Sequence, residues 1–275
     1  MRIRVYIFAL IALLLCDFAR AQNIPLTETS ESDVQARLRA AIEIPIARKW
    51  DVTWSEQLRL HNNLSNLDKV VSSVGVGYKP VKFLKLDAQY GFINERTSKS
   101  DNDTGIKTTE WKIRHRMNFD VTGSLRIGAV KLSLRERVRV QFRGDSVNRY
   151  EHSNPELSLR SRLKSSFNLR NPRWEPYAYV ELYTTLNAPG VVNNYLKEPL
   201  RYDNYCNRVR VGLGTEMKLS NSSKLDFYYM LNFNRSYDAR YKGISKDPSN
   251  DGDLKSWRLE KKCAHVICID YKFKL

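Results

Sequence analysis

The chain has no long hydrophobic run beyond its first 21 residues. A helix that crosses a membrane needs about 20 apolar residues, and the mean hydropathy of this chain is −0.52. A membrane domain built of helices is therefore excluded. A transmembrane β-barrel is not excluded, because its lipid-facing and lumen-facing residues alternate and their hydropathies average out.

The sequence also lacks the common motifs of catalysis and metal binding. It contains no glycine-rich phosphate loop, no spaced Cys/His zinc cluster and no Ser nucleophile elbow. We therefore expect no metal and no cofactor, and we favour a protein that is not an enzyme. Of the four cysteines, Cys16 lies within the first 21 residues and Cys206, Cys263 and Cys268 lie beyond them. Three is an odd number, which predicts buried or lipid-facing thiols and no disulfide framework.

Residues 1–21 have the organisation of a cleaved signal peptide. Arg2 and Arg4 precede an apolar stretch over residues 5–15. Ala19-Arg20-Ala21 then supplies the small residues that signal peptidase reads. We predict export with cleavage near Ala21, followed by a single domain over residues 22–275.

The same N-terminal stretch has an alternative interpretation as a lipoprotein signal. Leu13-Leu14-Leu15-Cys16 resembles the box in which the cysteine receives lipid. Leu15 stands where a small residue is usual in such a box, so the cleaved signal peptide is preferred.

Period-2 alternation is the main pattern of the mature chain. One segment alternates Leu132, Leu134, Val138 and Val140 with Lys131, Arg135, Arg137 and Arg139. A helix would spread these arginines around its axis, whereas a strand places all of them on one face. The alternation therefore predicts an all-β protein.

Eleven segments with this alternation can be identified along the chain. They are residues 34–44, 50–60, 68–79, 82–95, 111–121, 130–143, 157–170, 174–187, 205–219, 223–235 and 257–275. Long polar stretches follow some of them, and tight turns are expected near Lys79-Pro80, Thr122-Gly123, Asn171-Pro172 and Asn221-Ser222. Short turns at one end and long loops at the other are typical of a transmembrane barrel.

The alternation shows where strands lie, but the number of strands in the barrel needs a further argument. Bacterial single-chain barrels have even numbers of antiparallel strands and both termini on the periplasmic side. We therefore predict a transmembrane antiparallel up-and-down barrel of 12 strands, with 10 as the alternative. A soluble lipocalin-like barrel or sandwich would also alternate, but it would face its apolar residues inward and its strands would usually be shorter. In a closed transmembrane barrel, the charged face is the wet lumen.

The C-terminal segment indicates where the barrel is inserted. His265, Ile267, Ile269, Tyr271, Phe273 and Leu275 alternate up to the last residue. The aromatic-rich pattern over residues 261–275 resembles the C-terminal strand that outer-membrane proteins present to the barrel-insertion machinery, although Leu275 stands where Phe is preferred. We expect the outer membrane as the location, with its lipid and this machinery as partners and no nucleic-acid partner.

Four strand motifs resemble an uncharacterised family of outer-membrane β-barrels of Gram-negative bacteria. The motifs are Trp54-Ser-Glu-Gln-Leu-Arg59, Leu134-Arg-Glu-Arg-Val-Arg139, Tyr228-Tyr-Met-Leu-Asn-Phe-Asn234 and His265-Val-Ile-Cys-Ile-Asp-Tyr271. The family is the domain of unknown function two-four-nine-zero. The resemblance covers nearly the whole mature chain and implies a barrel and a location, but no activity.

A basic face is the strongest chemical feature of the sequence. The net charge is +16, and loss of three arginines and one aspartate with the signal peptide leaves +14. The cations concentrate on one face of three consecutive predicted strands, as Arg114, Arg116, Arg135, Arg137, Arg139, Arg143, Arg160, Arg162 and Lys164. Guanidinium rows bind carboxylate or phosphate or bias a pore toward anions. We expect a lumen that binds or passes small anions, or one neutralised by carboxylates of other strands.

Two other functions remain open from the sequence. His115 and Glu136 have the lipid-facing parity, and a turn centred near residue 125 would place them side by side, with Ser165 on the following strand. A Ser–His–acid set on the outer face would suit a phospholipase or acyltransferase acting on lipid. The third possibility is a structural or surface-interaction barrel that acts through its long loops.

Overall fold

The computed structural model describes residues 27–100, 107–144, 153–168, 173–189, 191–192, 199–201, 204–242 and 253–275. The predicted signal peptide, its cleavage at Ala21, the possible lipoprotein box and the predicted turn at Asn171-Pro172 lie outside these residues. In the part of the chain that is described, no helix is both long and apolar enough to cross a membrane.

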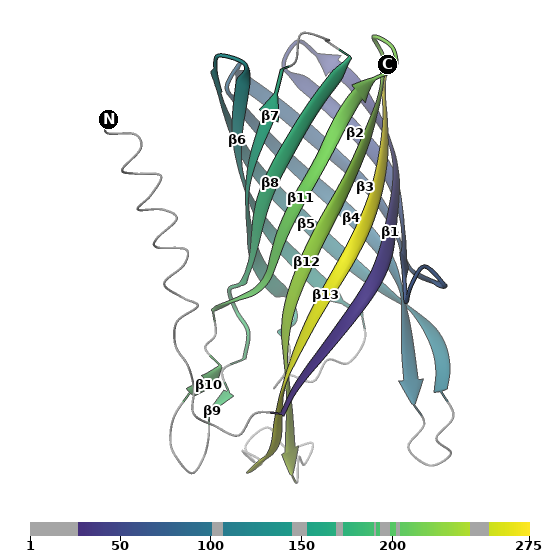
Figure 1. Ribbon diagram of the computed structural model, residues 1–275, viewed down its shortest axis with the longest axis vertical. Coiled ribbons are helices and arrows are strands. Elements are labelled where there is room, and N and C mark those ends of the chain that lie inside the picture. Colours follow the sequence, from purple (N-terminus) through teal and green to yellow (C-terminus); the bar gives the residue numbers. More distant parts are fainter. Residues whose placement is uncertain are drawn as a thin grey trace.

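Eleven long strands form one closed barrel (Figure 1). They are β1 (Thr27–Ala47), β2 (Trp50–His61), β3 (Asn66–Val81), β4 (Leu84–Ser100), β5 (Lys107–Ile127), β6 (Val130–Arg143), β7 (Glu156–Phe167), β8 (Trp174–Thr185), β11 (Tyr205–Lys218), β12 (Ser223–Lys242) and β13 (Asp253–Lys274). Neighbours in the sequence are neighbours in the barrel, and β8 pairs with β11. Between these two strands, β9 (Val191–Val192) and β10 (Pro199–Arg201) form a separate two-stranded sheet that the sequence did not predict.

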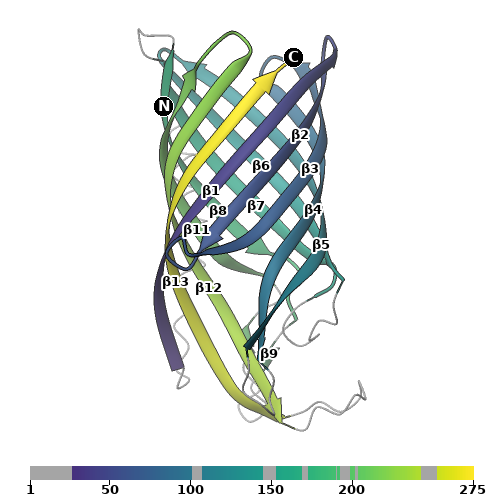
Figure 2. The ribbon, with the colours of Figure 1, turned by 90° about the vertical axis from the view of Figure 1, so that its right-hand side faces the viewer.

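The barrel closes through a parallel pair. β1 lies beside β13 in parallel register from Thr27 opposite Arg258 to Glu43 opposite Lys274, and Figure 2 shows the two strands side by side. Every other neighbouring pair of the barrel is antiparallel. An odd number of strands in up-and-down order requires one such parallel pair, so the predictions of 12 and of 10 strands were wrong. Each of the eleven alternating segments is a strand.

The parallel closure also places the two ends of the barrel chain apart. β1 begins at the end of the barrel where the long connections lie, and β13 ends beside the short turns (Figure 1). The expectation that both termini lie on one side was therefore wrong. It followed from the even strand count, which does not hold here.

Two predicted turns are also displaced. Lys79 and Pro80 lie inside β3, and the turn between β3 and β4 is formed by Lys82 and Phe83. Gly123 lies inside β5, and the turn between β5 and β6 is formed by Gly128 and Ala129. Gly128 has a φ of 59°, a left-handed conformation that glycine adopts without steric cost. Because the turn lies farther along the chain than predicted, the register between β5 and β6 differs from the expected one.

The two faces of the wall have opposite character. Leu134 and Val138 on the outer face of β6 are 43% and 38% exposed. Asn118 and Glu181, which face the interior from β5 and β8, are 1% and 0% exposed. The apolar side chains are therefore outside and the polar ones inside, which is the reverse of a soluble barrel.

One part of the interior is apolar and tightly packed. Its members lie on β8, β12 and β13 and are Tyr177, Tyr179, Met230, Ala264, Val266 and Cys268. Gly212 and Gly214 on β11 leave the room for this cluster, because a Cβ on Gly212 would overlap the Tyr179 ring and one on Gly214 would overlap Tyr228. The described cysteines form no disulfide with one another, and Cys268 is buried in this cluster while Cys206 and Cys263 are half-buried.

We expect Gly212→Ala to lower the free energy of unfolding by about 1–3 kcal/mol, the usual cost of overpacking. Gly123→Ala is the matched control, because nothing lies within 4 Å of the added methyl group. Urea unfolding of the refolded protein in detergent, followed by tryptophan fluorescence, measures both changes. Equal stability of the two variants would contradict the close packing of β11 against Tyr179.

Candidate functional site

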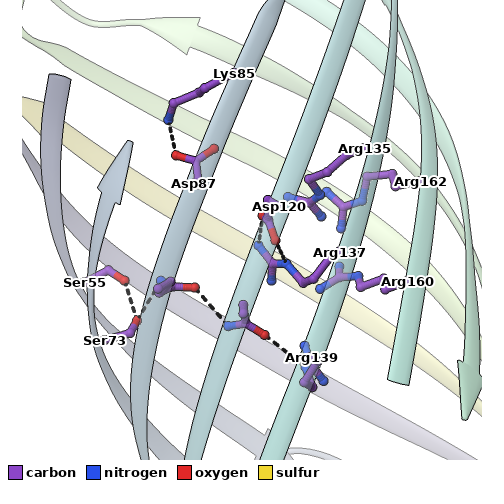
Figure 3. A network of polar contacts seen from close by, with 12 residues as sticks. Ser55, Ser73, Lys85, Asp87, Asp120, Arg135, Arg137, Arg139, Arg160 and Arg162 are labelled. Atoms are coloured by element: carbon purple, nitrogen blue, oxygen red, sulfur yellow. Dashed lines mark hydrogen bonds and ion pairs between the residues drawn. The ribbon is translucent and has the colours of Figure 1, made fainter. Parts of the chain in front are cut away.

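The middle of the barrel contains a cavity of about 180 Å³ surrounded by arginines. We call this cavity the arginine chamber. Eleven arginines line it, from β1, β2, β5, β6, β7 and β11, namely Arg37, Arg39, Arg59, Arg116, Arg135, Arg137, Arg139, Arg160, Arg162, Arg208 and Arg210. Figure 3 shows the five that come from β6 and β7. Asp270 is the one carboxylate among the described residues that line the chamber.

Several of these arginines face another arginine directly across the strands. Arg135 lies opposite Arg162, and Arg137 lies opposite Arg160. On the other side of the barrel Arg37 lies opposite Arg59. Like charges in directly opposite positions destabilise a sheet, so the chamber needs anionic groups to offset this repulsion.

Glu181 on β8 provides part of this compensation. Its side chain is fully buried and its Oε1 lies 3.0 Å from Arg210 Nη1. Its Oε2 is shared by Arg160 and Arg162 and lies 3.7 Å from Arg135 Nη2. One carboxylate thus holds four guanidinium groups together, and the net charge of this set remains positive.

Asp120 on β5 provides a second anionic group. Arg137 donates from Nε to Asp120 Oδ1 at 2.6 Å and from Nη2 to Oδ2 at 2.5 Å (Figure 3). This bidentate geometry is the strongest form of an arginine–carboxylate contact. Asp120 is therefore fully engaged by one arginine and does not neutralise the others.

Six arginines of the chamber have no ion pair with any described carboxylate. They are Arg37, Arg39, Arg59, Arg116, Arg139 and Arg208. The Nε atoms of Arg37, Arg116 and Arg208, like those of Arg135 and Arg160, are buried without an acceptor among the described residues. The chamber therefore offers cationic hydrogen-bond donors that the rest of the described protein does not use.

A chain of hydrogen bonds runs around the inner wall and holds some of these groups in place. It passes through Arg39, Ser55, Ser73, Gln89, Asn118 and Arg139, on six consecutive strands from β1 to β6, with distances of 3.0–3.2 Å. Figure 3 shows its course from Ser55 to Arg139. Each partner is a neutral amide or hydroxyl group. Arg39 and Arg139 are therefore oriented without loss of their charge.

Tyr183 has the same effect on the opposite wall. The guanidinium carbons of Arg139, Arg160, Arg208 and Arg210 lie 4.7–5.4 Å from its ring centroid. Its hydroxyl oxygen accepts hydrogen bonds from Arg210 at 3.1 Å and from Arg139 at 3.5 Å. Cation–π contacts of this kind attract a guanidinium group without neutralising it. Arg160 and Arg210 also pair with Glu181, whereas Arg139 and Arg208 remain available to an anion.

The arginine chamber continues into two other cavities. Toward the short turns lies a cavity of about 350 Å³, the short-turn chamber, which shares Arg39, Gln89, Arg135, Arg137 and Asp270 with it. Six basic and five acidic side chains line the short-turn chamber, so its charges nearly balance. Toward the long loops lies a cavity of about 310 Å³, which shares Arg208. Four basic and two acidic side chains line this third cavity, so the excess of cations is greatest in the arginine chamber.

The structure places the predicted basic residues on the inner face of β5, β6 and β7. Six of the nine line the arginine chamber: Arg116, Arg135, Arg137, Arg139, Arg160 and Arg162. Of the others, Arg114 pairs with Glu95 at 2.8 Å and Arg143 pairs with Glu156 at 2.7 Å. Lys164 Nζ lies 3.6 Å from the centroid of the Tyr177 ring.

Sequence reasoning missed five arginines and the central acid of the chamber. The arginines are Arg37, Arg39, Arg59, Arg208 and Arg210, and the acid is Glu181. On three strands the basic face was identified from charges at alternate positions. The same rule applied to β1, β2 and β11 would have found these arginines. Glu181 has the parity of Tyr179 and Tyr183, but its four partners lie on three other strands and are not visible in the sequence.

The structure does not bring together the proposed lipid-facing trio. His115 lies opposite Phe142, and its Nδ1 is 2.6 Å from the Tyr90 hydroxyl. Glu136 lies opposite Val121 and accepts a hydrogen bond from Ser161 Oγ at 2.6 Å.

The predicted pairing of His115 with Glu136 was therefore wrong, because the turn lies at Gly128 and not near residue 125. Phe142 and Glu136 are six residues apart on β6, so His115 and Glu136 are separated by roughly 20 Å at 3.3 Å per residue. Ser165 lies opposite Leu132, farther along toward the short turns. In the described ranges, no three His, Cys, Asp or Glu side chains gather as a metal site would require.

Comparison with known protein families shows the family to which this chain belongs. Residues 34–241 match the family model described as a protein of unknown function, DUF2490. The chain belongs to the DUF2490 family. This confirms the resemblance drawn from its strand motifs. A comparison with curated proteins finds no match.

Two solved structures are similar to this DUF2490 barrel at low identity. One is outer-membrane expressed OmpT of Vibrio cholerae, with 15% identity and a TM-score of 0.35, over 68% of this chain and 55% of that one. The other is in-vitro folded OmpT, an outer membrane protein of Vibrio cholerae, with 13% identity and a TM-score of 0.37, over 77% and 57%. The DUF2490 chain thus spans little more than half of each of these proteins, and neither likeness bears on its function.

In this DUF2490 barrel we expect Glu181→Gln to lower the free energy of unfolding by about 3–5 kcal/mol, the usual cost of removing one partner of a buried ion pair. Glu175→Gln is the matched control, because Glu175 is on the same face of β8, is half-buried and has no ion pair with a described residue. Urea unfolding measures both variants. An equal and small effect of the two substitutions would contradict the central role of Glu181.

Proposed function

We propose that this protein spans the outer membrane of a Gram-negative bacterium and binds or passes small anionic solutes through the arginine chamber. The observation that carries the proposal is the set of six chamber arginines without a carboxylate partner among the described residues. A set of cations held by neutral groups is the arrangement that an anion-binding site requires.

The outer face of the wall supports the location. Large apolar side chains are exposed on every one of the strands β1 to β8 and on β11, β12 and β13. Such a surface is stable in lipid and would associate in water. The signal peptide predicted over residues 1–21 and the alternating C-terminal segment over residues 261–275 agree with insertion into the outer membrane.

The chemistry of guanidinium supports the class of solute. Arginine presents its donors in a planar fork that matches the oxygens of carboxylate and phosphate groups. Arg37 is 9% exposed, and its Nε has no acceptor among the described residues. The chamber is small and crossed by long side chains, so a solute that passes it must contact these groups. We therefore infer that binding precedes passage.

The orientation of β6 provides a test of the membrane location. In a protein without its three cysteines, new cysteines replace Arg135, Arg137 and Arg139, or Leu134, Val138 and Val140. In outer-membrane vesicles, a water-soluble thiol reagent should label the first set and not the second. Three arginines facing lipid at mid-bilayer would cost roughly 6–12 kcal/mol if additive. Labelling of the second set only, or recovery of the protein in the soluble periplasm, would contradict the proposal.

Anion selectivity is tested in planar bilayers and by calorimetry. We expect the reversal potential in a KCl gradient to show anion preference, and pyrophosphate to bind the refolded protein. Arg37→Gln should weaken pyrophosphate binding roughly tenfold or more, because a hydrogen bond to a charged group contributes about 1.5–3 kcal/mol. Arg126→Gln removes the same charge from an exposed position near the short turns and is the control. Cation selectivity, or the absence of both conductance and binding, would exclude the proposed function.

A further inference from the structure

Asp270 on β13 lies at the boundary between two of the interior cavities. It lines both the arginine chamber and the short-turn chamber. Its Oδ1 atom is buried and has no hydrogen-bond partner among the described residues. Arg39 is its direct neighbour on β1, but the Arg39 guanidinium group donates to Ser55 Oγ on β2 at 3.2 Å. Asp270 is therefore an acid with unused acceptor capacity beside a group of cations.

Asp270 also belongs to a row of acids that runs across three strands. It lies opposite Asp226 on β12, and Asp226 lies opposite Glu216 on β11. The other two acids have partners, because Asp226 accepts a hydrogen bond from the Tyr177 hydroxyl at 2.7 Å and Glu216 pairs with Lys224 at 2.8 Å. Three acids in directly opposite positions repel one another. A cation beside Asp270 would relieve this repulsion.

An unused cationic donor lies close to this unused acid. Arg37 is opposite Cys268, two residues before Asp270 on the same strand. With strands about 4.8 Å apart and about 3.3 Å per residue, the Cα atoms of Arg37 and Asp270 are separated by roughly 8 Å. Both side chains line the arginine chamber. A buried donor and a buried acceptor of opposite charge thus face one cavity from adjacent strands without binding each other.

We infer that the solute of this site is a small zwitterion, with its anionic group on Arg37 and the neighbouring carboxylate-free arginines and its ammonium group on Asp270. The inference rests on the proposed function, since it assigns the second charge of a solute whose first charge is held by the arginine chamber. A solute with both charges would satisfy both unused groups at once. A simple anion would leave Asp270 without a partner and would be repelled by it.

The test compares two ligands that differ only in this charge. 2-Aminoethylphosphonate and propylphosphonate have the same chain length, with an ammonium group in the first and a methyl group in the second. Calorimetry on the refolded mature protein should show about tenfold tighter binding of 2-aminoethylphosphonate, the effect of one hydrogen bond to a charged group. In Asp270→Asn this difference should disappear, while the affinity for propylphosphonate should not fall.

Asp87→Asn is the control for this substitution. Asp87 lines the short-turn chamber with the same charge, but its carboxylate is already paired with Lys85 at 2.6 Å. The tighter binding of 2-aminoethylphosphonate should persist in this variant.

Equal affinities of the unaltered protein for the two ligands would overturn the zwitterion inference and leave the proposed function standing. Binding of neither ligand would overturn the zwitterion inference, and the proposed function would then be decided by the conductance and pyrophosphate measurements. This comparison needs no variant, so it holds even if Asp270→Asn fails to fold.

Discussion

Adjacent side chains of a strand must point to opposite faces, and this constraint governs the whole barrel. β6 carries Arg135, Arg137 and Arg139 on one face, with Leu134, Val138 and Val140 on the other. An open sheet with such a pattern would expose an apolar face to water. Closing the sheet places most large apolar side chains on the outer surface and the eleven arginines of the chamber inside. The concentration of charge in the middle of the barrel is thus a direct result of its closure.

The arginines inside the barrel are held in two ways, by carboxylates or by neutral groups. Glu181 and Asp120 bind arginines as ion pairs and neutralise part of their charge. Tyr183 and the amide and hydroxyl groups around the wall hold arginines and leave their charge intact. The first arrangement stabilises the fold, because a buried guanidinium group without compensation is costly. The second keeps the cationic groups oriented toward the cavity, as a preorganised site for an anion requires.

The strands could be predicted from the sequence because each has one charged and one apolar face, and all eleven segments were found on that basis. The predicted number of strands was wrong because bacterial barrels usually have an even number. Twelve strands were therefore expected, although only eleven alternating segments had been identified. Register was not accessible, since Gly123 inside β5 and Gly128 in the turn have the same sequence signature. The site was found in part. Arginines on β5 to β7 repeat within short segments, whereas the partners of Glu181 come from strands far apart in the chain.

The parallel pair β1–β13 gives the barrel wall one strip that differs from the rest. Parallel strands form evenly spaced, slanted hydrogen bonds and pair slightly less strongly per residue than antiparallel strands. All other neighbouring strands of the barrel are joined by one connecting segment. β1 and β13 are not, because all the other strands lie between them in the chain. If these two strands separate, no direct connection limits how far their edges move apart. The two edges uncovered there present free backbone groups that can pair with a strand from another chain.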